Sequence, residues 1–459
     1  MWRLGLADGA ERVSEGSLRC VDWVASVLER CVATEPKFHA YSEIDAVGAL
    51  AHAQKLDRQL AHRRRTGGDR DRMVRPLLGA PISVKDSVDV AGLRTTAGSR
   101  WFSRTPRRDA LVVGRLRHEG AVVIGKVVAH EFGFGVNRVP TLSPWGEQYY
   151  TGGSSAGSAV SVALGSSVGS VGSDAGGSIR IPAALNGIVG LRPTPGRVPR
   201  EGVVPLSPST GTVGPLARTV RDCELLYGAM SGHRRVAPRE VRVTEGGRWR
   251  IGLVRQLSGP EVALDPRIRD ALDGLREETS GVAVFAIDLA EVEQAVCVQL
   301  TIMLAEAAAI HHSQAQEHWD EYSEEVREML RQGALISGVD LVEAIRLRER
   351  FAFSARKVME VDGLDALCHP TVPCEAVPLT ALHGTLSGGG TAMDSYVRQS
   401  FVASVAGLPA LSVPIGQGMQ GLPIAIEMIG RSGREEQLFA LARYLQGVGL
   451  VSEPAFPKV

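Results

Sequence analysis

Residues 151–190 read TGGSSAGSAVSVALGSSVGSVGSDAGGSIRIPAALNGIVG. Two tight Gly/Ser turns, at 152–157 and 173–178, flank a segment of small residues that we interpret as a helix. The second turn leads into a further predicted helix, so its backbone N–H groups are expected to converge as an anion site. Acyl transfer requires a hydroxyl nucleophile and oxyanion donors in one turn, and this stretch supplies both.

Other interpretations of the same stretch are less consistent with its residues. A Gly/Ser linker would not contain the apolar side chains that this stretch has. A phosphate-binding loop would need a G-x-x-x-x-G-K-[ST] motif, which is absent. Residues 153–157 satisfy G-x-S-x-G, which would make Ser155 the nucleophile of a hydrolase elbow. That motif follows a buried strand, whereas residues 144–151 are polar and typical of a loop.

Composition excludes several function classes. Fifty-one basic and 51 acidic residues leave no net charge, so no basic field for nucleic acid is expected. The N-terminus has no signal-peptide pattern, and no run of 18 apolar residues predicts a membrane span. The six scattered cysteines predict buried, reduced thiols in the cytoplasm and no zinc site. Neither a metal nor a cofactor is expected.

A lysine ends the apolar run that begins at Leu77 and continues to Val84. At the end of a buried strand, Lys85 would be desolvated, which lowers its pKa and makes a neutral amine available as a base. On these residues alone, a surface lysine after an edge strand is the favoured interpretation. Strand and helix patterns alternate around this segment and predict a mixed α/β sheet.

The rest of the chain gives a coarser outline. Residues 62–75 are predicted to form a basic surface loop, after a helix capped by Asp45 that reaches about Leu60. Long helices are expected at 291–312, 315–331 and 339–361, and a flexible loop at 384–391. The adjacent His311 and His312 are interpreted as structural.

Together these pieces resemble the amidase signature family. The motifs that carry the resemblance are Val84-Lys85-Asp86, the Gly152–Ser158 turn, Asp174–Pro182 and Gly187–Thr194. The resemblance implies one large α/β domain over residues 1–459, with a central mixed sheet of about eleven strands flanked by helices. Residues 231–364 match no motif, and we interpret them as a divergent segment that shapes the substrate site.

The family resemblance also implies a catalytic apparatus. Ser178 matches the nucleophile, Ser154 the serine that follows a cis peptide, and Lys85 the base. The implied oxyanion hole is formed by the backbone N–H groups of Ala175, Gly176, Gly177 and Ser178. Asp174, Arg180 and Ser155 are expected around the site, and we interpret Asp174 and Arg180 as an ion pair rather than as a substrate-carboxylate site. Ala156 and Gly211 depart from residues common in the family.

The expected function is amide hydrolysis through an acyl-enzyme, with release of ammonia or an amine. An ammonia-producing A-type subunit of a tRNA-dependent amidotransferase is one alternative, and a non-catalytic amide-binding protein is another. The expected partner is a small-molecule amide, without nucleic acid or membrane, and a homodimer is compatible with the sequence.

Overall fold

The computed structural model describes residues 1–66, 75–232, 248–276, 281–384 and 391–457. Within these ranges, one mixed sheet has the strand order β1-β3-β2-β4-β6-β5-β10-β11-β9-β7-β8. The strands are β1 (Tyr41–Ile44), β2 (Pro81–Lys85), β3 (Val122–Val127), β4 (Gly169–Asp174), β5 (Val189–Arg192), β6 (Thr212–Ala217), β7 (Trp249–Val254), β8 (Val282–Ile287), β9 (Ala366–Pro370), β10 (Ala410–Gln417) and β11 (Pro423–Gly430). The predicted α/β class and the single large mixed sheet are confirmed.

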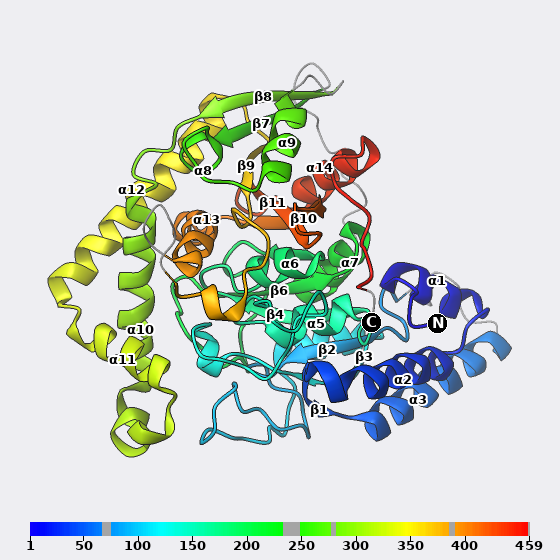
Figure 1. The fold of residues 1–459 in the computed structure, drawn as a ribbon. Helices are drawn as coiled ribbons and strands as arrows, with labels where there is room; N and C mark the ends of the chain where they lie inside the picture. Colours follow the sequence, from blue (N-terminus) through cyan, green and yellow to red (C-terminus); the bar gives the residue numbers. More distant parts are fainter. Residues whose placement is uncertain (67–74, 233–247, 277–280, 385–390, 458–459) are drawn as a thin grey trace.

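Helices flank this sheet on both sides (Figure 1). In the first half of the chain they are α1 (Leu6–Glu15), α2 (Cys20–Phe38), α3 (Ala46–Arg65), α4 (Leu111–His118), α5 (Ala156–Ala163), α6 (Arg180–Asn186) and α7 (Val220–Ser231). In the second half they are α8 (Arg255–Ser258), α9 (Pro266–Arg276), α10 (Gln294–His318), α11 (Glu324–Leu335), α12 (Gly338–Val361), α13 (Ala392–Ala406) and α14 (Glu435–Gly447).

The basic segment predicted as a loop is partly helical. Asp45 caps α3 as expected, because its carboxylate accepts a hydrogen bond from the Gly48 amide at 2.8 Å. The helix then continues to Arg65, five residues past Leu60, so the prediction of a loop from residue 62 is wrong. Three consecutive arginines in its last turn interact favourably with the negative end of the helix dipole. Residues 67–74 lie outside the described ranges, as do 385–390 of the predicted flexible loop.

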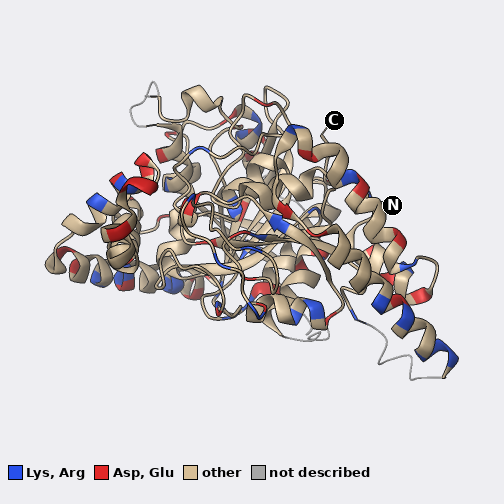
Figure 2. Cartoon of the chain, turned by 90° about the horizontal axis from the view of Figure 1, so that it is seen from below, with Lys and Arg blue, Asp and Glu red and all other residues tan. Residues whose placement is uncertain are grey.

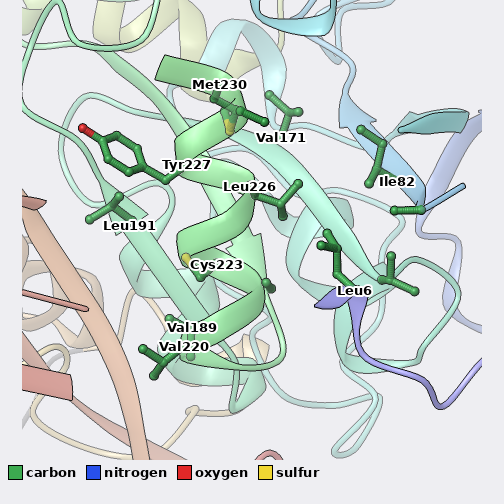
Figure 3. Packing of buried hydrophobic residues seen from close by; sticks show 14 of the residues in the cluster. Leu6, Ile82, Val171, Val189, Leu191, Val220, Cys223, Leu226, Tyr227 and Met230 are labelled. Carbon is green, nitrogen blue, oxygen red and sulfur yellow. The ribbon is translucent and has the colours of Figure 1, made fainter. Parts of the chain in front are cut away.

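The centre of the sheet is covered by α7, whose apolar face points at the strands (Figure 3). Leu226 is fully buried, and a Cβ added at Gly169 in β4 would lie 2.4 Å from it. Glycine at this position therefore allows the helix to approach the strand closely. Val171 of β4 and Val189 of β5 are also buried in this cluster, which makes the middle of the sheet a rigid support for the chain that follows β4.

The middle of the chain forms a helical layer at one side of the sheet (Figure 1). The predicted helix at 315–331 is wrong in its bounds: α10 runs to His318, a 3₁₀ turn follows at Trp319–Glu321, and α11 begins at Glu324. Ser323 causes the new start, because its hydroxyl accepts a hydrogen bond from the Val326 amide.

Helix α10 and the turn after it, Gln294–Glu321, are long and apolar enough to cross a membrane by length and composition alone. In the most apolar window of that segment, 44% is buried within the protein. Helix α10 packs against α11, α12 and α13, as a core helix does.

Charged residues of both signs are mixed along most of the outer helices, and basic residues gather at the end of α3 (Figure 2). This distribution matches the equal numbers of acidic and basic residues in the sequence.

Candidate active site

Lys85 is the last residue of β2, which lies inside the sheet between β3 and β4. Its side chain is 0% exposed, so the interpretation as a surface lysine after an edge strand is wrong. The amine nitrogen lies 2.7 Å from the Ser154 hydroxyl oxygen and 2.9 Å from that of Ser173. Burial lowers the pKa of Lys85 to about 7, although the negative charge of Asp174 acts to raise it. A substantial fraction of neutral amine is therefore present at neutral pH.

Ser154 follows a cis peptide bond from Gly153. Only glycine fits at the two positions before Ser154, because other atoms lie where a Cβ would be. A Cβ at Gly152 would lie 2.5 Å from Pro182, and one at Gly153 would lie 2.6 Å from the His130 ring. His130 also donates its amide hydrogen to the Ser154 carbonyl at 3.1 Å. Burial, together with the charge of Lys85, lowers the pKa of His130 to about 3, so this ring is neutral beside the amine.

Ser178 lies in the turn between β4 and α6 and is half-buried. It lines the same cavity as Ser154 and Ser173. Its carbonyl accepts a hydrogen bond from the Ser155 amide at 3.3 Å, which ties the two Gly/Ser turns together. The structure thus brings the three residues Lys85, Ser154 and Ser178 to one place, as the motif order predicts.

The turn before Ser178 is shaped by Asp174. The carboxylate of Asp174 accepts hydrogen bonds from the Gly177 amide at 2.8 Å and from the Ile179 amide at 3.1 Å. Of the four amides expected to form the oxyanion hole, that of Gly177 is therefore directed at Asp174. Within the described part of the chain, no hydrogen bond from the amides of Ala175, Gly176 or Ser178 occurs.

Asp174 and Arg180 form the ion pair expected from the sequence, with both side chains fully buried. Arg180 Nε lies 3.0 Å from Asp174 Oδ2, and Arg180 Nη1 lies 2.7 Å from Glu427 Oε1 on β11. Arg192 approaches Asp174 Oδ1 at 3.1 Å. Burial raises the pKa of Asp174, but the two arginines outweigh it and hold this pKa well below the usual range. Arg180 is enclosed by these partners and is not available to a substrate.

Ser155 has a structural position. Its side chain is 0% exposed and donates to the Ser173 carbonyl at 3.3 Å. It precedes α5, and the described residues immediately before it form no strand, so the nucleophile-elbow interpretation is not supported.

The sequence analysis did not identify four residues that contribute to the candidate site. Ser173 lies in the Gly/Ser-rich stretch 151–190, but only the register of β4 directs its hydroxyl at Lys85. Glu427 and Arg192 join Asp174 and Arg180 from distant strands. Gln299, on α10 in the divergent segment, is fully buried and donates to the Ala175 carbonyl at 2.9 Å. A search for polar residues inside apolar helical runs would have singled out Gln299, but it would not have shown that Gln299 contacts the Ala175 carbonyl.

The described residues contain no group of three or more His, Cys, Asp or Glu side chains that could hold a metal ion. All six cysteines are free thiols; Cys297 is exposed and Cys374 is half-buried, contrary to the expectation that all are buried. His311 is buried and its ring contacts the Tyr322 hydroxyl at 3.0 Å, whereas His312 is exposed.

A cavity of about 210 Å³ opens beside the catalytic candidates. Its polar lining includes Ser154, Ser173 and Ser178, and one wall is the segment 203–208. The Ser207 hydroxyl in that wall donates to Glu306 of α10 at 2.5 Å. A hydroxyl, a buried amine and unengaged backbone amides beside one cavity are the elements that nucleophilic acyl transfer needs.

The chain belongs to the amidase family, since the family model described as Amidase matches residues 22–439. Among similar curated proteins, the A-type Glutamyl-tRNA(Gln) amidotransferase subunit of Roseiflexus sp. (strain RS-1) is 34% identical, over 97% of this chain and 96% of its own length. Mandelamide hydrolase of Pseudomonas putida is 31% identical, over 98% of this chain and 92% of its own.

Solved structures agree with this assignment. A crystal structure of an amidase is 31% identical, with a TM-score of 0.86 over 97% of this chain and all of the other. The peptide amidase of Stenotrophomonas maltophilia is 28% identical, with a TM-score of 0.79 over 99% of both chains. The expectation of an amide-hydrolysing enzyme is confirmed at the level of the family.

Proposed function

We propose that this enzyme hydrolyses the C–N bond of a carboxylic amide through an acyl-enzyme on Ser178. The observation that carries the proposal is the contact between a fully buried Lys85 amine and the Ser154 hydroxyl, beside the cavity that Ser178 also lines. A buried neutral amine can act as a general base, and a hydroxyl can accept one proton while it donates another.

In the proposed reaction, Lys85 takes the proton of Ser154, which in turn takes the proton of Ser178. The Ser178 oxygen bonds to the amide carbon, and the backbone amides of Ala175, Gly176 and Ser178 stabilise the oxyanion. As the C–N bond breaks, Ser154 returns a proton to the leaving nitrogen, which departs as ammonia or an amine. Water then hydrolyses the ester and restores Ser178.

A fluorophosphonate probe tests the assignment of the nucleophile. We expect covalent labelling of Ser178, identified by mass spectrometry of the digested protein. Ser178→Ala should abolish labelling, and Ser155→Ala is the matched control because Ser155 belongs to the same pair of turns but is buried. Labelling of Ser155 in a chain whose Ser178 stays unmodified would contradict the proposal.

A second candidate is the ammonia-producing subunit of a tRNA-dependent amidotransferase. It is favoured by the 34% identity to one such protein over 97% of this chain. We propose instead that the chain acts in the cytoplasm on a small amide, without nucleic acid or an obligatory second protein. The purified chain should then release ammonia from a simple amide on its own. Glutamine hydrolysis that appears only after partner proteins and tRNA are added would establish the second candidate.

A further inference from the structure

The size of the cavity beside Ser178 limits what can bind there. Its volume is about 210 Å³, whereas ligand pockets usually measure about 300–1,000 Å³. An apolar cavity of about 150 Å³ is large enough to take up benzene. The space therefore accommodates one ring or a short branched chain together with the carboxamide.

Apolar and polar residues line the cavity in similar numbers. The apolar ones are Phe132, Ala175, Val203, Val204, Pro205, Leu206, Pro208 and Val213. Phe132 is held by other rings, with centroids 4.4 Å away at His311 and 5.7 Å away at Trp101. A Cβ placed on Gly133 would lie 3.7 Å from the Ser154 hydroxyl and 3.8 Å from Leu206. Leu206 thus faces the reacting centre across a glycine.

Few charged residues line the cavity, and each already forms hydrogen bonds within the protein. Among the described lining residues, only Asp174 and Arg200 carry charge. Both carboxylate oxygens of Asp174 accept hydrogen bonds, from buried arginines and backbone amides. Arg200 is exposed and donates to the carbonyls of Pro208 at 2.8 Å and Gly211 at 3.0 Å. Behind the wall, the Glu306 carboxylate accepts hydrogen bonds from Ser207 and Ser209 and does not line the cavity. A bound ammonium group would therefore meet no unengaged carboxylate at the cavity surface, where Arg200 is also a cation.

We propose that the substrate is a compact, uncharged amide with an apolar acyl group, which packs between Phe132 and the segment 203–206. This inference rests on the proposed function, because it takes Ser178 as the attacking group. It separates the substrate from free glutamine, whose α-ammonium group meets no unengaged carboxylate in this cavity. A buried charge without a partner is strongly unfavourable.

Isobutyramide and alaninamide test the charge requirement directly. They have the same number of heavy atoms and differ by a methyl group in place of an ammonium group. The comparison is made at pH about 6, where about 99% of alaninamide is protonated, since α-amino groups titrate near 8. We expect kcat/KM for isobutyramide to exceed that for alaninamide by at least about 100-fold, and glutamine to be cleaved no better than alaninamide.

Leu206→Asp and Leu206→Asn form a matched pair of variants. Asp places a carboxylate at the wall that faces the reacting centre, while Asn changes shape and polarity equally without the charge. We expect Asp to reduce the isobutyramide-to-alaninamide ratio at least about tenfold below that of Asn, because the ammonium gains a counter-charge. Only the ratio is compared, so an equal loss of activity on both substrates does not affect the result.

Labelling of Ser178 by a fluorophosphonate distinguishes a failure of the substrate inference from a failure of the proposed function. A chain that labels at Ser178 but cleaves alaninamide or glutamine as well as isobutyramide overturns the substrate inference and leaves the proposed function standing. A chain that labels but cleaves none of the neutral amides overturns it too, as does an equal ratio in the two Leu206 variants. Absence of both labelling and turnover overturns the proposed function itself.

Discussion

Lys85 Nζ lies 2.7 Å from Ser154 Oγ, and its other hydrogen-bond partner among the described residues is the Ser173 hydroxyl at 2.9 Å. Two neutral hydroxyls do not compensate an ammonium group for the loss of water as a carboxylate would. The nearby charge of Asp174 opposes the desolvation of Lys85, but Asp174 is itself paired with two arginines. This balance favours a neutral lysine beside Ser154, where the proposed reaction requires a base.

The pH dependence of activity should follow the titration of Lys85. Because burial lowers its pKa to about 7, the neutral amine is lost as pH falls below 7 and is fully present above it. We expect kcat/KM to fall about tenfold per pH unit on the acid side and to level off on the alkaline side. A pH–rate profile with an uncharged amide measures this. A profile that is flat between pH 5 and 9 would show that Lys85 is not the base.

Lys85 and Ser154 should behave as one unit. Lys85→Met keeps most of the length of the side chain but removes the base, so kcat should fall by about 10²–10⁴-fold with little change in KM. Ser154→Ala should fall in the same range. The double variant should be little worse than either single one, because both residues serve the same proton transfer. Fully additive losses in this double-mutant cycle would contradict a relay.

Local patterns explain what the sequence predicts well. The apolar run before Lys85 is a short-range signal, and β2 ends at that residue. The cis peptide before Ser154 is implied only by the family resemblance, and the structure has it. The helix that begins after Asp45 is also expected from the sequence, but its end is not. Nothing in the sequence stops α3 at Leu60, since arginines are good helix formers and suit its last turn.

Long-range partners explain what the sequence does not reveal. Glu427 meets Arg180 only because β11 and α6 come together in the fold. Ser173 is one of many serines in its stretch, and only the sheet register directs it at Lys85. Such contacts depend on tertiary packing, and neither the hydrophobic periodicity of the sequence nor a sequence motif predicts them.

The buried charge network around Arg180 should be important for stability. Arg180→Met would leave the carboxylates of Asp174 and Glu427 with one cation fewer in a fully buried site. We expect a loss of about 3–5 kcal/mol in the free energy of unfolding, measured by denaturant titration. Arg346→Met is the matched control, because Arg346 is 72% exposed and pairs with Glu343 at the surface. Its effect should stay within about 0.5 kcal/mol, and an equal loss for both variants would contradict the network's role.

Gln299 should act as a positioning residue that links the divergent segment to the catalytic turn. Its side-chain amide donates to the Ala175 carbonyl at 2.9 Å and to the Thr210 hydroxyl at 3.0 Å. Gln299→Met keeps the shape but removes both hydrogen bonds, each of which contributes about 1 kcal/mol. We expect kcat to fall about five- to tenfold with KM nearly unchanged, because the turn that carries Ser178 is less precisely held. Gln316→Met, at an exposed position of the same helix, is the control and should retain full activity. Steady-state kinetics of both variants on one neutral amide measure the effect, and an unchanged kcat in Gln299→Met would show that α10 does not influence the catalytic turn through this side chain.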